Sequence, residues 1–72
     1  MTEFEALCET TLQNQEMLVR ELRYQVAAAG EHGDDIRRSL RHHEDKLREL
    51  RLIVAHTLPD PSVARQIIHN QP

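Results

Sequence analysis

Two apolar stripes with the same spacing, one on each side of a glycine-marked break, constrain the fold of this chain most strongly. Side chains that recur at alternating steps of four and three residues lie along one face of an α-helix and form the seam of a helix pair. The first stripe is Cys8, Leu12, Gln15, Val19, Leu22, Val26 and Ala29, and the second is Ile36, Leu40, His43, Leu47, Leu50, Val54 and Thr57. The sequence therefore predicts two helices that share one interface.

The two stripes match when the chain is folded back on itself about positions 30–33. The resulting layers pair Ala29 with Ile36, Val26 with Leu40, Leu22 with His43, Val19 with Leu47, Gln15 with Leu50, Leu12 with Val54 and Cys8 with Thr57. No layer is skipped, so the expected fold is all-α, with two long helices in an antiparallel hairpin.

Local signals mark where each helix begins and ends. Thr2 followed by Glu5 is the pattern of a capping box, and Gly30 supplies the left-handed conformation that a helix end commonly requires. Asp34 is the expected N-cap of the second helix, which Pro59 ends. The expected elements are a first helix over about 3–29, a bend over 30–34, a second helix over about 35–58 and a short third helix over about 61–69, all in one domain of residues 1–72.

The third helix is predicted from the Asp60-Pro61 pair, because an acidic N-cap followed by proline is a good helix start. Its apolar face is Val63, Ala64, Ile67 and Ile68. We expect this face to fold across the open end of the hairpin, near Phe4, Leu7 and Leu58.

The chain is small, and its apolar surface exceeds what one helix seam covers. A domain of 72 residues gains little stability from its own core, and the single cysteine, Cys8, cannot form an internal disulfide. We therefore expect a homodimer in which two hairpins form a four-helix bundle, or docking on another protein. The residues expected at the partner or dimer interface are Phe4, Leu7, Thr11, Leu18, Tyr24, Ile53 and Leu58.

Charge is unevenly distributed, although the formal net charge is only -3. Residues 1–19 contain glutamates but no lysine or arginine, whereas residues 37–51 are rich in arginine. In an antiparallel hairpin, Arg51 is expected to attract the glutamates of the first helix. The candidate contacts to nucleic acid are Arg37, Arg41 and Arg48.

Three seam residues are polar or reactive. Gln15 and His43 are expected to fix the register and the oligomeric state, as polar seam residues commonly do. An alternative hypothesis makes His43 a pH sensor, because protonation of a packed imidazole would loosen the bundle. Cys8 is expected to act as a small hydrophobic side chain, and near a dimer axis it could crosslink on oxidation.

The residue patterns of catalysis, metal binding and membrane insertion are not evident in the sequence. No nucleophile has a suitably spaced base, and glycine-rich phosphate loops are lacking. The adjacent His42 and His43 point about 100° apart on a helix, whereas helical ligand pairs are three or four residues apart. The longest apolar run, 52–55, is a single helical turn. We therefore expect no enzymatic activity, no metal or cofactor, and no membrane-spanning segment.

These features favour a non-enzymatic protein–protein interaction module in the cytoplasm, such as a small adaptor, chaperone or regulator. The compartment is inferred from the single cysteine and from opening residues that lack the basic and apolar regions of a signal peptide. One alternative is an RNA-binding hairpin dimer. In length and shape, such a dimer resembles the small plasmid hairpin proteins that regulate RNA. Another is a small structural subunit of a larger assembly, such as a secretion, phage or transcription complex.

Overall fold

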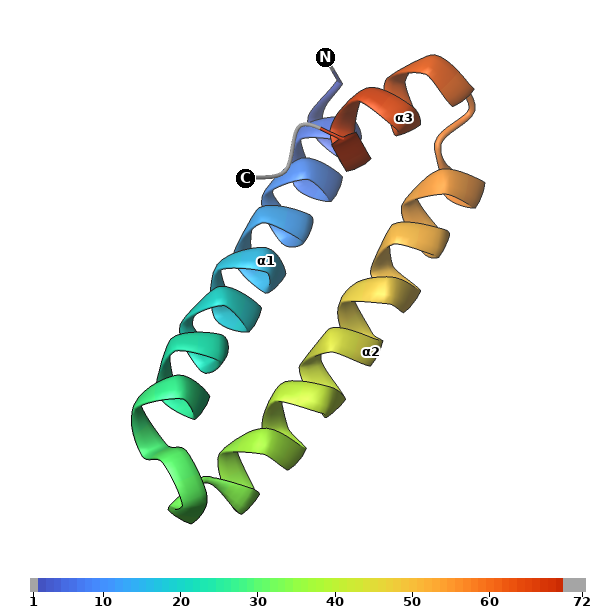
Figure 1. Ribbon diagram of the computed structural model, residues 1–72. Helices are drawn as coiled ribbons and strands as arrows, with labels where there is room; N and C mark the ends of the chain where they lie inside the picture. Colours follow the sequence, from blue (N-terminus) through green and yellow to red (C-terminus); the bar gives the residue numbers. More distant parts are fainter. Residues whose placement is uncertain (1, 70–72) are drawn as a thin grey trace.

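The fold is a hairpin of two long helices with a third, short helix across its open end. The computed structural model describes residues 2–69, and its elements are α1 (Glu3–Ala29), a 3₁₀ turn η1 (Gly30–His32), α2 (Asp34–Thr57) and α3 (Pro61–His69). Figure 1 shows α1 and α2 running side by side in opposite directions, with α3 at the end away from the bend. The all-α class is confirmed, and residues 2–69 contain no strand.

The start of α1 confirms the predicted capping box. The Thr2 backbone amide donates to Glu5 Oε1 over 2.9 Å, and the Glu5 amide donates to Thr2 Oγ1 over 3.1 Å. The pKa of the Glu5 carboxyl is lowered from its ordinary 4.5, mainly by the hydrogen bond from the Thr2 backbone amide. The hydrogen bond with the Thr2 side chain lowers it further. The helix therefore begins where two orphan amides are satisfied reciprocally.

The bend between α1 and α2 differs in detail from the prediction. Gly30 has the expected positive φ of 58°, but its ψ of -127° is not that of a left-handed helix. Gly33, not Asp34, is the N-cap of α2, and it forms no side-chain capping bond. The Asp34 carboxylate instead accepts from Arg37, 2.7 Å away, and Arg37 also donates to the Gly30 carbonyl over 2.8 Å. Because Arg37 holds both groups, Asp34 is drawn away from the capping role.

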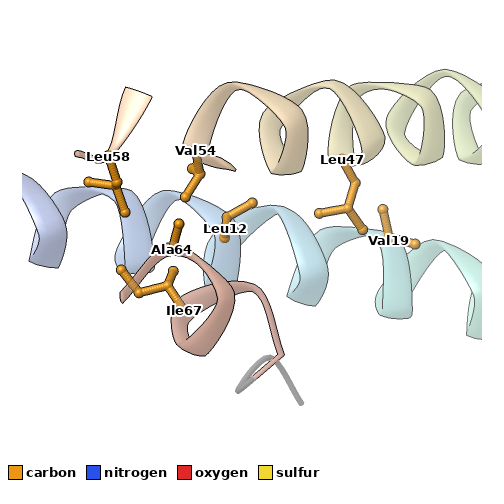
Figure 2. Close-up of a cluster of buried hydrophobic side chains, with 7 residues drawn as sticks. All are labelled: Leu12, Val19, Leu47, Val54, Leu58, Ala64 and Ile67. Atoms are coloured by element: carbon orange, nitrogen blue, oxygen red, sulfur yellow. The ribbon is translucent and has the colours of Figure 1, made fainter. Parts of the chain in front are cut away.

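The core is concentrated at the open end, where three helices meet. The seam residues Leu12, Val19, Leu47 and Val54 are each no more than 4% exposed. Leu58, Ala64 and Ile67 join them, and Val63 and Ile68 pack against the same cluster, which confirms the predicted apolar face of α3. Figure 2 shows this cluster. Toward the bend the seam is less covered, since Val26, Ala29, Ile36 and Leu40 are only half-buried.

The two polar seam residues meet, although the predicted layers placed them apart. The Gln15 amide nitrogen lies 3.0 Å from the His43 carbonyl oxygen and 3.2 Å from His43 Nδ1. Because a buried amide must find hydrogen-bond partners, the long Gln15 side chain reaches beyond the layer of Leu50, its predicted neighbour. An amide nitrogen only donates, so this contact requires Nδ1 to be the ring nitrogen without a proton.

Candidate interaction surface

An apolar groove lies between α1 and α2 near the open end of the hairpin. It has a volume of about 180 Å³. Its lining residues, which define the apolar groove, are Phe4, Leu7, Cys8, Thr11, Leu50, Ile53, Val54 and Thr57. The groove is lined both by residues at the edge of the seam and by the surplus apolar residues beside it.

Helical spacing explains how the groove is built. Leu7, Thr11 and Leu18 follow one another at steps of four and seven, so they share one face of α1 beside the seam. On α2, Ile53 occupies the corresponding position. Leu7 is 61% exposed and Ile53 is 55% exposed, so the hairpin itself leaves much of their surface in water.

The third helix packs on the other side of α2 and does not cover the groove. Ala55 lines a hollow together with the α3 residues Pro61, Ala64 and Ile68. Ala55 is two residues from Ile53, and side chains two apart on a helix point about 200° apart. The apolar face of α3 is therefore used in the core, while the groove remains open.

The structure divides the predicted interface residues into three groups. Phe4, Leu7, Thr11 and Ile53 line the groove together, and Leu18 is partly exposed on the same face of α1. Tyr24 is 68% exposed but does not line the groove. The prediction that Leu58 lies at the partner or dimer interface is wrong, because this residue is 5% exposed and belongs to the core. The reason is that α3 folds back over it, so Leu58 is unavailable to a partner.

Half of the groove lining comes from residues that the sequence assigned to the seam. Cys8, Leu50, Val54 and Thr57 were all expected inside the seam, yet they line the groove. Their place in the four-three pattern gave no sign of this, because the pattern does not show how far the helices separate at their edges. Exposed apolar side chains also occur away from the groove, at Met17 and Leu52.

The opposite side of the hairpin is held by ion pairs between the helices. Arg51 pairs with Glu16, whose side chain is 10% exposed, which confirms the predicted attraction between Arg51 and the glutamates of helix one. Arg23 Nη2 lies 3.1 Å from Glu44 Oε2. We call this side the polar flank. Both pairs join residues at matching heights of antiparallel helices, so they support the same orientation as the apolar seam.

The candidate nucleic-acid contacts are largely engaged within the chain. Arg37 bonds Asp34 and the Gly30 carbonyl, and Arg48 Nη1 lies 3.5 Å from Asp45 Oδ1. Arg41 is exposed and forms no salt bridge with residues 2–69. Arg37, Arg38 and Arg41 line one shallow hollow near the bend, but Asp34 lies in it as well. An acidic neighbour weakens the attraction of such a hollow for phosphate.

No group of three or more histidine, cysteine, aspartate or glutamate side chains within residues 2–69 is placed to hold a metal ion. Nor does any helix in that range have the length and apolar character needed to span a bilayer. Cys8 is a half-buried free thiol at the edge of the groove.

No protein-family model matches the chain, and neither a curated protein nor a solved structure shows significant similarity to it. The geometry of the site therefore carries the evidence for function. That geometry defines a small all-α hairpin with one polar flank closed by ion pairs and one side that carries an open apolar groove.

Proposed function

We propose that this chain is a non-enzymatic protein–protein interaction module, acting as a small adaptor, chaperone or regulator. The observation that carries the proposal is the apolar groove, which lies open beside large exposed side chains such as Leu7 and Ile53. Removing apolar surface from water contributes about 25 cal/mol per Å². A partner that covers the groove would therefore gain binding free energy from side chains that the fold leaves exposed.

The shape of the groove favours a helical partner. It runs between two helices, so a further helix laid along it would bury side chains at spacings of three and four residues. The residues that would contact this helix directly are Phe4, Leu7, Thr11 and Ile53, and Leu18 lies further along the same face of α1. We further propose a cytoplasmic location, consistent with the free thiol of Cys8.

A matched pair of neighbouring substitutions tests this function. Ile53→Asp places a charge in the groove, whereas Leu52→Asp changes a side chain of almost equal exposure, 56% against 55%, that does not line it. Tagged wild-type and variant proteins would be used to recover bound proteins from cells, after circular dichroism has shown that the helices are intact. We expect the bound protein to be lost with Ile53→Asp and retained with Leu52→Asp.

Two outcomes would contradict the proposal. Equal recovery with both variants would mean that the groove does not bind the partner. Recovery of RNA that is lost with Arg41→Glu, and not with Ile53→Asp, would favour the basic face of α2 instead. Arg41 is the suitable probe for RNA because its guanidinium forms no salt bridge within residues 2–69.

A further inference from the structure

We propose that the occupant of the apolar groove is a second copy of this chain. The two hairpins would pair about a two-fold axis parallel to their long axis, so that α1 of each chain faces α2 of the other in a four-helix bundle. This inference rests on the proposed function, because it names the partner of the same groove.

The dimensions of the hairpin suit such a pairing. The molecule measures 45 × 17 × 16 Å, so one long face has an area of the order of the ~800 Å² that each partner contributes to a standard interface. The groove alone occupies only the open end of that face. A stable dimer therefore requires the full length of two hairpins to overlap.

The uneven polarity of the face selects the direction of the two-fold axis. The groove lies at the open end, whereas the same side toward the bend carries polar residues such as Glu21 and Lys46. If the two-fold axis were perpendicular to the helices, the two overlapping hairpins would point in opposite directions. Each groove would then face the polar half of its partner. An axis parallel to the helices instead places groove on groove and polar half on polar half.

The polar half is complementary to itself in this arrangement. Glu21 lies three residues beyond Leu18, and Lys46 lies seven residues before Ile53, so both are on the side that carries the groove. The Arg23–Glu44 pair shows which residues of the two helices lie at the same height. Glu21 is two residues before Arg23, and Lys46 is two residues after Glu44, so in antiparallel helices these two residues also lie at one height. Because α1 faces the partner's α2, each Glu21 would lie opposite a Lys46 of the second copy.

The state of the charges in the single chain supports this pairing. On the polar flank, Glu16 and Glu44 are paired with arginines of the other helix. Glu21 and Lys46 are both exposed, and neither forms a salt bridge with any of residues 2–69. The side with the open groove is thus also the side on which these two opposite charges have no ion-pair partner among the residues that the structure describes.

Charge reversal provides a test that depends on the two-fold arrangement. Sedimentation equilibrium of the full chain should show a dimer for wild type and for Leu52→Asp, and a monomer for Ile53→Asp. Glu21→Lys alone and Lys46→Glu alone should each weaken self-association roughly tenfold, because two symmetry-related attractions become repulsions. An equimolar mixture of these two variants should recover the affinity, since every contact in the mixed dimer again joins opposite charges.

The possible failures separate this inference from the proposed function. A wild-type chain that stays monomeric at high concentration would overturn the inference, while loss of another protein with Ile53→Asp would leave the function standing. A dimer that Ile53→Asp weakens, but whose charge variants are not rescued by mixing, would reject the proposed axis. Circular dichroism of each variant checks that the helices are intact, so that a monomeric result reflects lost association and not unfolding.

Discussion

The contact between Gln15 and His43 can be tested by its contribution to stability. Sequence spacing alone places these two residues in different layers, so the contact is specific to the folded structure. Gln15 is 8% exposed, and its amide nitrogen contacts both the carbonyl oxygen and Nδ1 of His43. Gln15→Ala removes both contacts and should lower the free energy of unfolding by about 2 kcal/mol. His43→Ala removes only the ring contact, because the carbonyl belongs to the backbone.

A double-mutant cycle isolates the ring contact. A hydrogen bond between side chains contributes about 1 kcal/mol net, so the two substitutions together should cost about 1 kcal/mol less than the sum of their separate effects. The measurement is urea unfolding followed by circular dichroism at one protein concentration, near neutral pH. The control cycle combines Gln15→Ala with His56→Ala, which changes an exposed histidine of the same helix.

The control pair sets the limit for coupling between residues that do not touch. Independent sites are additive within about 0.3 to 0.5 kcal/mol, and the Gln15 and His56 pair should fall in that range. If Gln15 and His43 were equally additive, the amide would not contact the imidazole in solution. That result would reject the Gln15–His43 contact but not the hairpin, because Val19 of α1 and Leu47 of α2 belong to one buried cluster that does not depend on it.

Two further predictions concern stability. Leu12→Ala should cost about 3 to 5 kcal/mol, since this side chain is 0% exposed, whereas Leu52→Ala, at 56% exposed, should change stability by less than about 0.5 kcal/mol, as measured by urea unfolding. The lowered pKa of Glu5 means that its ionised form stabilises α1 above pH 4.5 and that this contribution is lost as the pH falls through the folded-state pKa. Wild type should therefore melt at a higher temperature than Glu5→Gln near neutral pH, and the difference should vanish in acid; a difference that stays constant with pH would contradict the assignment.

The proposed dimer gives a reason for the distribution of charge along the chain. Exposed ion pairs contribute little stability, typically less than about 1 kcal/mol each. They nevertheless select orientation, because a wrong alignment brings like charges together. The pairs on the polar flank orient α2 against α1, and Glu21 with Lys46 would orient one hairpin against the next.

Features that depend on residues close together in the chain could be predicted from the sequence. The helical period of the stripes fixed the all-α class, and the Thr2 and Glu5 side chains fixed the start of α1 because each reaches the other's amide within one turn. Asp60 similarly caps α3, accepting from the Ser62 amide over 2.9 Å. Such local interactions can be read from spacing because helix geometry fixes the distances involved.

Features that depend on the path of the chain and on the reach of its side chains became visible only in the folded structure. The bend uses Gly33 as the N-cap because Arg37 binds Asp34 and the Gly30 carbonyl. The short α3 buries Leu58 and packs against one side of α2, which leaves the groove on the other side open. Spacing tells which residues share a helix face, but it does not tell which of two flanking faces a later helix will cover, because that choice is made by packing in three dimensions.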